Sequence, residues 1–157
     1  HELSISGAPS ESINFNINLV SGKDLSVNEA SPEVGLLRSA FLSLGIQLNE
    51  NLNINPSWRY SRLERIEAGE DYFNGSITRL NVRYQFNQAF NIRLITEKNS
   101  FNDQFFLQPL IQWNPNPSTI FYFGGNQRTL ENIEDAHFQI LQFNRSQFFV
   151  KFQYLID

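Results

Sequence analysis

Apolar and polar residues alternate at every second position through most of the chain, which is the pattern of β-strands with two unlike faces. The stretch 77–86 shows it without interruption. One face there carries Thr78, Leu80, Val82, Tyr84 and Phe86, and the other carries Ile77, Arg79, Asn81, Arg83 and Gln85. Similar alternation marks 13–19, 40–48, 52–60, 90–97 and 148–156. The pattern predicts an all-β protein.

The connections between these predicted strands alternate between short and long. Residues 49–51, 87–89 and 114–118 make short connections, whereas 21–35, 62–75 and 124–136 are long. Tight turns at one end and longer loops at the other are typical of outer-membrane barrels. The segments amount to about eight strands, and 130–142 fits either a short helix or part of a strand. With this strand number both chain ends lie on the periplasmic side.

We therefore expect an antiparallel up-and-down transmembrane β-barrel, or the closing part of a larger barrel. Residues 1–12 are expected to form an N-terminal periplasmic extension, and 13–157 the β-barrel domain. Pro56 and Pro109 fall inside strand patterns. Because proline lacks the N–H that a central strand donates, each is expected to mark a bulge.

The composition favours a lipid-facing sheet over a soluble one. Aromatic residues make up 14% of the chain and include 15 Phe, while charged residues make up 18%, below the roughly 25% of soluble domains. Several strands reach about ten residues, the length that a tilted strand needs to cross lipid. The residues that suit interfacial aromatic belts near strand ends are Trp58, Tyr60, Tyr84, Trp113, Tyr122 and Tyr154. The alternative is a soluble lipid- or ligand-binding barrel, whose strands alternate in the same way.

Other classes of protein fit less well. A net charge of −4 argues against a nucleic-acid partner, which would need a basic surface. The chain has no Cys, so it offers neither a disulfide nor a cysteine metal site. It has no apolar run of the roughly 18 residues that a membrane-spanning helix needs. It also shows no signal peptide, so we expect a mature protein or a piece of a longer one.

A set of motifs in the C-terminal part resembles a known family. In order, they are 80–87 (LNVRYQFN), 92–95 (IRLI), 107–110 (LQPL), 113–122 (WNPNPSTIFY) and 148–155 (FFVKFQYL). From about Leu36 to Ile156 the chain resembles the C-terminal barrel region of a domain-of-unknown-function family of Bacteroidetes-type bacteria. In that family the barrel follows a family-9-like carbohydrate-binding module. The resemblance implies a Gram-negative outer-membrane barrel and supplies no catalytic residues.

Two departures from the family qualify this resemblance. The carbohydrate-binding module is not in this sequence, which weakens a sugar-related role. The sequence ends in Ile156-Asp157 rather than in the terminal aromatic residue common among outer-membrane barrels.

Charged residues recur on the predicted non-lipid face. They are Arg59, Arg79, Arg83, Arg93, Glu97 and Lys151. Charges in a narrow interior must be paired or hydrated. We expect a structural network of arginine with glutamate and asparagine that fills the lumen of a barrel of about eight strands, because such a lumen is just wide enough for side chains. The alternative is a weakly anion-selective pore within a larger barrel.

A catalytic site is hard to assemble from this sequence. Of the two histidines, His1 is terminal and His137 lies in the ambiguous segment, and the spacing indicates no nucleophile beside either. Carboxylates cluster at Glu64, Glu67, Glu70 and Asp71, but no calcium motif supports a metal site there. Tyr72 and Phe73, in the same predicted loop, could contact a partner or glycan, although packing within the loop is the simpler interpretation.

The predicted function is therefore an outer-membrane barrel with a structural, anchoring or partner-binding role and a lumen plugged by side chains. The expected partners are outer-membrane lipid and another outer-membrane protein. We expect no enzyme activity, no cofactor, no metal and no nucleic-acid partner. The alternatives are a pore or uptake component for sugar-derived or anionic solutes, and the soluble ligand-binding barrel.

Overall fold

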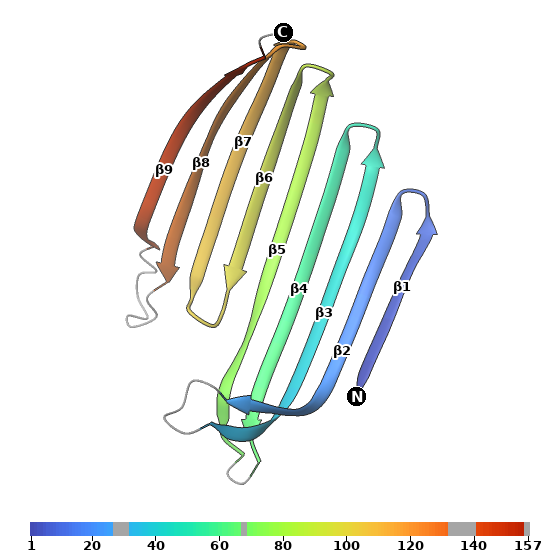
Figure 1. The fold of residues 1–157 in the computed structure, drawn as a ribbon, viewed down its shortest axis with the longest axis vertical. Helices are drawn as coiled ribbons and strands as arrows, with labels where there is room; N and C mark the ends of the chain where they lie inside the picture. Colours follow the sequence, from blue (N-terminus) through green and yellow to red (C-terminus); the bar gives the residue numbers. More distant parts are fainter. Residues whose placement is uncertain (27–31, 67–68, 132–140, 156–157) are drawn as a thin grey trace.

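The computed structural model describes residues 1–26, 32–66, 69–131 and 141–155. They form nine β-strands in one open sheet, and each strand is antiparallel to its sequence neighbours (Figure 1). The strands are β1 (Glu2–Ser10), β2 (Ile13–Ser26), β3 (Glu33–Asn49), β4 (Leu52–Arg65), β5 (Asp71–Asn87), β6 (Phe90–Asn99), β7 (Gln104–Asn116), β8 (Thr119–Glu131) and β9 (Leu141–Tyr154). The prediction of an all-β, antiparallel, up-and-down fold is confirmed. Within the described residues no helix has the length and hydropathy to cross a membrane.

Short and longer connections alternate, as the sequence predicts. Turns of two residues (11–12, 50–51, 88–89 and 117–118) lie at one end of the sheet, and the longer connections lie at the other (Figure 1). An asparagine closes three of the four short turns: Asn49, Asn87 and Asn116 each accept a backbone N–H two residues ahead at 2.9–3.1 Å. This side-chain mimic of a backbone turn is the reason asparagine is favoured at such positions.

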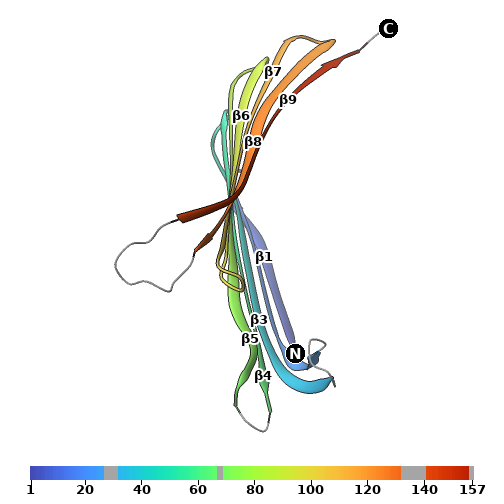
Figure 2. The same ribbon diagram turned by 90° about the vertical axis from the view of Figure 1, so that its left-hand side faces the viewer.

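The sheet is a single curved and twisted layer, which Figure 2 shows nearly edge-on. Cross-strand register collects side chains of one class on each face. Ile17, Leu42, Trp58 and Thr78 stand side by side on one face, and Asn18, Phe41, Arg59 and Ile77 stand side by side on the other. We call these the apolar face and the polar face.

The apolar face continues across the whole sheet. Its members include Leu3, Ile5, Phe15, Ile17, Leu42, Leu44, Ile46, Ile54, Leu80, Val82, Ile92, Leu94, Ile111, Phe123, Val150 and Phe152. The described residues contain only two buried hydrophobic side chains, Leu63 and Ile95, and both are on the polar face. The apolar face is therefore not the inside of a soluble core formed by the described part of the chain.

Three expectations about strands and ends are corrected. The sheet has nine strands rather than about eight, because residues 1–12, expected as an extension, contribute β1 and the turn into β2. Since nine is odd, the chain ends lie at opposite ends of the sheet, with the N-terminus at the end of the longer connections (Figure 1). Strand β1 has few large side chains. Only Leu3 and Ile5 alternate with serine before the Gly-Ala-Pro run, so the alternation is too short to predict a strand.

The expected bulges at the two internal prolines are also wrong. The β4–β5 register is unbroken through Pro56↔Leu80, and the β6–β7 register is unbroken through Leu94↔Pro109. Each proline also has a second neighbouring strand. The β3–β4 register is the same on both sides of Pro56, and the β7–β8 register is the same on both sides of Pro109. Antiparallel strands alternate between bonded and non-bonded pairs, so a missing N–H can be accommodated without an extra residue.

The strands reach further into the long connections than predicted. β2 continues to Ser26, β4 to Arg65 and β8 to Glu131, and β5 already begins at Asp71. In the ambiguous segment 130–142, the described residues 130–131 and 141–142 belong to β8 and β9, and the remaining ones lie outside the described residues.

Candidate functional site

The structure brings all six charged residues singled out by the sequence to the polar face. Strands β5 and β6 carry most of them in two cross-strand rows, Ser57–Arg79–Glu97 and Asn53–Arg83–Arg93. Arg59 lies one alternate position beyond Ser57 on β4, and Lys151 lies on β9 opposite Tyr122. That this face lines a lumen stays a prediction.

These side chains do not join into one network. Arg79 and Glu97 form the only ion pair among the six that the described residues show, with Nη1 and Oε2 3.6 Å apart. Arg59 instead lies over the Phe41 ring, 5.2 Å from its centroid, and Lys151 lies 5.6 Å from the centroid of Tyr122. Two of the five cations in this set are thus accommodated by aromatic rings, a contact worth about 0.5–1 kcal/mol at exposed sites.

Arg83 and Arg93 face each other directly across β5 and β6. Neither makes an ion pair within the described part of the chain. The Nε atom of Arg93 is buried without a hydrogen-bond partner, and so is the Oδ1 atom of Asn81, which is diagonal to it in the same two strands. Buried polar atoms normally have a hydrogen-bond partner, so these two unpartnered atoms are the most unusual polar feature of the described part of the sheet.

Two further arginines on the polar face were missed by sequence reasoning. Arg128 on β8 lies opposite Arg145 on β9 and extends the row of Arg79 and Glu97 through Phe106 on β7. The signal that could have found them is the alternation of β8 and β9. It was obscured because 130–142 was ambiguous and because β9 has a register shift between its pairings with Arg128 and Thr129.

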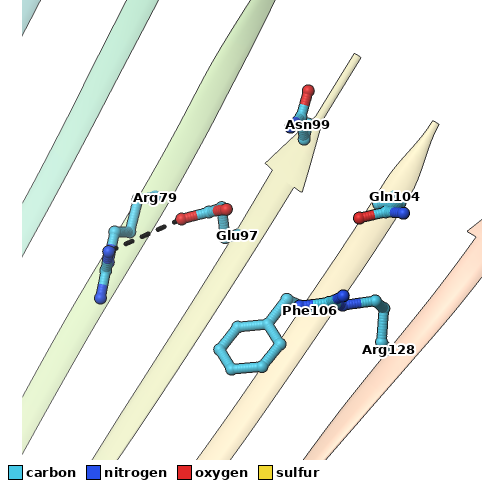
Figure 3. A pocket seen from close by; sticks show the side chains of 6 residues that line it. All are labelled: Arg79, Glu97, Asn99, Gln104, Phe106 and Arg128. Atoms are coloured by element: carbon cyan, nitrogen blue, oxygen red, sulfur yellow. Dashed lines mark ion pairs between the residues drawn. The ribbon is translucent and has the colours of Figure 1, made fainter. Parts of the chain in front are cut away.

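A hollow of about 140 Å³ lies along this row (Figure 3). It is lined by Arg79, Glu97, Asn99, Gln104, Phe106 and Arg128. Figure 3 shows the Arg79 and Glu97 side chains pointing toward each other across β5 and β6, with Arg128 beside Phe106. The lining therefore contains two guanidinium groups and one carboxylate.

A second and larger hollow of about 420 Å³ lies over β2 to β5 on the same side of the sheet. Small polar side chains dominate its lining, which consists of Asn14, Phe41, Ser43, Leu44, Gly45, Asn55, Pro56, Ser57, Arg79 and Asn81. The side chain of Asn14 packs against Gly45, where an added Cβ would come within 2.5 Å of it. The polar face is thus recessed where its side chains are short.

The charge of the polar face differs from that of the whole chain, which is −4. Along the strand bodies its cations are Arg59, Arg79, Arg83, Arg93, Arg128, Arg145 and Lys151, against the carboxylates Glu2 and Glu97. Several other carboxylates of the described chain gather at the end of the longer connections. The polar face therefore has an excess of positive charge away from that end.

Tyr72 and Phe73 belong to strand β5 rather than to a loop. Tyr72 is the extra residue at a bulge between the pairs Leu63↔Phe73 and Glu64↔Asp71. Its hydroxyl accepts a hydrogen bond from Arg65 Nε at 3.2 Å and donates one to Glu33 at 2.5 Å. The bond from Arg65 lowers the pKa of Tyr72, but the bond to Glu33 and partial desolvation outweigh it, so the pKa is raised.

An ion-paired rim surrounds Tyr72. Arg62 donates to Asp71 at 2.7 Å, a hydrogen bond that raises the pKa of Arg62. Arg65 pairs with Glu33 at 3.3 Å and with Glu70 at 3.6 Å. Phe73 packs edge-on against Phe101, with ring centroids 6.1 Å apart. Both residues singled out for a partner contact are therefore tied into the sheet end.

The described residues hold no group of three or more His, Cys, Asp or Glu that could bind a metal. Of the predicted carboxylate cluster, Glu64 and Asp71 pair with Arg62 and Glu70 pairs with Arg65. Glu67 and His137 lie outside the described residues.

Comparison with known proteins adds no assignment. No family model, curated protein or solved structure matches this chain. The family resemblance given above therefore stays a prediction, and function has to be argued from the sheet itself.

Proposed function

We propose that this chain forms part of the wall of an outer-membrane β-barrel in a Gram-negative bacterium, with its apolar face toward lipid and its polar face toward the lumen. Its role in this proposal is structural: the wall anchors the longer connections, or a partner membrane protein, at the cell surface. The observation that carries the proposal is the exposed apolar face.

Large apolar side chains on this face are open rather than packed. Phe148 is 79% exposed, Val150 73% and Phe123 54%. Contiguous exposed apolar surface of this kind marks a contact with protein or membrane. Because the face runs across every strand of one layer, lipid is an occupant that covers it all at once.

Aromatic rings line the short-turn border of the apolar face, and one stacked pair lies toward the other border. At the short-turn end, Tyr84, Phe86 and Phe90 contact one another in sequence, with centroids 4.5 and 5.2 Å apart. Trp113, Phe121 and Phe152 continue this row, with centroids 5.3 and 5.1 Å apart. Toward the other end, Trp58 stacks on Tyr60. Aromatic girdles flank the apolar band of outer-membrane barrels in this way.

The length of the strands agrees with this placement. β3 and β5 have 17 residues each and β4 has 14, whereas a tilted strand crosses the hydrocarbon with about 9–11 residues. The surplus extends beyond the apolar band at the end of the longer connections. The ion-paired rim around Tyr72 lies in this surplus, where water would solvate it.

Strand direction supports a barrel larger than these nine strands. The edges β1 and β9 point the same way because both have odd numbers in an antiparallel series. Closing the sheet on itself would pair them in parallel, whereas single-chain bacterial barrels are antiparallel with an even number of strands. If a second copy of the chain were inserted in the same orientation, β9 of one copy would meet β1 of the other, and this pairing would again be parallel. The proposal therefore includes an odd number of strands from another sequence segment.

A second candidate, a pore for anionic or sugar-derived solutes, is favoured by the positive polar face and its hollows. A lumen filled by side chains was expected for eight strands, and a wider barrel removes that premise. Planar-bilayer recording separates the two roles. Stable anion-preferring conductance steps would favour the pore, and their absence would favour the structural wall.

Membrane integration is the test of the proposal itself. The protein, expressed with its full natural chain in a Gram-negative host, is expected in the outer-membrane fraction, resistant to alkaline carbonate and extracted by detergent. On a gel, the unheated sample should migrate as a compact form that boiling abolishes. A protein that stays folded in buffer without detergent would contradict the proposal and favour the soluble ligand-binding barrel.

A further inference from the structure

The directly opposed pair of Arg83 and Arg93 needs an explanation, because like charges at facing positions of an antiparallel pair are destabilising. The register places them opposite each other within an unbroken series of pairs that runs from Ile77↔Asn99 to Gln85↔Asn91. A one-residue change of either side chain to a neutral amide would relieve the repulsion. Their pairing on the recessed side of the sheet is the starting point for a binding site.

The residues around this pair supply no counter-charge. On the flanking strands, Arg83 faces Asn53 and Arg93 faces Leu110. The diagonal neighbours within β5 and β6 are Asn81, Gln85, Asn91 and Ile95. Within the described residues the carboxylate closest along these two strands is Glu97, which pairs with Arg79. The cross-strand and diagonal neighbours of the pair are thus amides and apolar groups, and Arg83 itself is exposed.

The hydrogen bonding of Arg93 is incomplete. Its Nε atom is buried without a partner, although a guanidinium carries five N–H donors and no acceptor. The Oδ1 atom of Asn81 is also buried and unpartnered. Rotating that amide by half a turn would present an NH₂ donor on the same side, since the two ends of an asparagine amide are interchangeable in this way.

We propose that Arg83 and Arg93, with Asn81 beside them, form a binding site for an oxyanion: the phosphate, sulfate or carboxylate group of a solute. An anion between the two guanidinium groups would neutralise their repulsion and accept their forked hydrogen bonds, the geometry for which arginine is suited. The assignment rests on the proposed function, in which the polar face lines the lumen, and it supplies a solute-binding site for the second candidate, the pore.

The neighbouring hollow at Arg79 and Arg128 is a weaker candidate for the same ligand. Its lining includes Glu97, whose carboxylate would repel an oxyanion and already pairs with Arg79. Arg128 also lies opposite an arginine, Arg145. Among the described residues, however, the buried and unpartnered guanidinium nitrogen is that of Arg93, and no carboxylate faces the Arg83–Arg93 pair.

Titration of inorganic sulfate into the detergent-purified protein with its full natural chain tests the site. Calorimetry would be run at constant ionic strength set with NaCl, so that only specific binding gives heat. We expect saturable binding, weakened at least tenfold in both Arg83→Gln and Arg93→Gln. Arg93→Lys keeps the charge but loses the fork, so its affinity should fall between those of the wild type and Arg93→Gln.

The matched control is Arg59→Gln, which removes a charge from the same face where the side chain lies over Phe41. It should leave sulfate affinity within about twofold of the wild type. The absence of saturable sulfate binding, or equal weakening by all the variants, would overturn the site. Heat-modified gel migration of each protein separates the two proposals: a membrane-integrated protein without sulfate binding refutes the site alone, and sulfate binding by a water-soluble protein refutes the membrane wall alone.

Discussion

A single arginine placed on either face of β3 distinguishes a lipid-facing sheet from a water-facing one. Leu44 lies midway along the apolar stretch 40–48 of β3 and faces Phe15 of β2. Ser43 is the adjacent residue on the polar face, between Asn16 and Ser57, and it lines the hollow of about 420 Å³. The variants Leu44→Arg and Ser43→Arg therefore add the same side chain one residue apart.

The expected difference follows from the depth of Leu44 in the proposed membrane. An arginine on the lipid face of a barrel near the bilayer midplane costs about 2–4 kcal/mol. Because 1.4 kcal/mol is about a tenfold change in an equilibrium constant, Leu44→Arg should reduce the ratio of folded to unfolded protein by about 30- to 700-fold. Ser43→Arg enters a recessed polar surface and should change the free energy of unfolding by less than about 1 kcal/mol.

Equilibrium unfolding in urea, with the protein in lipid vesicles, measures both values through the fluorescence of Trp58 and Trp113. The midpoint should fall for Leu44→Arg and stay near the wild-type value for Ser43→Arg. Equal stability of the two variants would refute the reasoning, because a face in water accommodates an arginine on a half-buried site as readily as the opposite face does.

Three smaller predictions concern the sheet outside this test. Gly35→Ala should lower the free energy of unfolding by about 1–3 kcal/mol, because an added Cβ would meet a leucine side chain at 2.8 Å and a backbone carbonyl oxygen at 2.9 Å. Gly22→Ala, with open space around it, is the control. Equal urea midpoints for the two variants would contradict the clash. A double-mutant cycle on Arg79 and Glu97, 50% and 31% exposed, should give a coupling energy below about 1 kcal/mol. Tyr72→Phe should lower the urea midpoint at pH 8. Since the folded pKa of Tyr72 is raised, this difference should persist up to the ordinary tyrosine pKa of about 10 and disappear as the pH rises through the folded value; a difference independent of pH would contradict the assigned hydrogen bond.

Much of the fold can be read from local chemistry. Period-two alternation identifies β5 and β6 because their apolar residues are large and their polar residues are charged or amide-bearing. The asparagines that end β3, β5 and β7 mark the short turns, since each side chain caps its own turn. Each of these signals depends on residues only a few positions apart, so the strands and turns can be predicted without knowledge of the tertiary structure.

What the sequence does not reveal depends on pairing across strands. β1 has weak alternation of its own and is recognisable as a strand only by its register with β2. The bulge at Tyr72 is likewise invisible in a single segment, because it is defined by two residues that face one. Strand number, and with it the direction of the two edges, therefore emerged only from the paired sheet.

The candidate site shows the same division. Alternation is enough to assign Arg79, Arg83 and Arg93 to one face, but it does not say which of them pair. That Arg79 meets Glu97 while Arg83 meets Arg93 follows from the β5–β6 register. Arg128 and Arg145 were missed because their rows are set by the pairing of β8 with β9.

Site-directed labelling along β5 tests the membrane wall most directly, and because these 157 residues contain no cysteine, an introduced thiol is unique within them. Spin labels would be placed singly at 78–86 in the membrane-embedded protein, and their collisions with oxygen and with a water-soluble nickel complex measured. Labels at Leu80 and Val82 should collide with oxygen and be shielded from nickel, while labels at Asn81 and Arg83 should show the reverse. Equal exposure of all positions to the nickel complex would contradict a lipid-facing sheet.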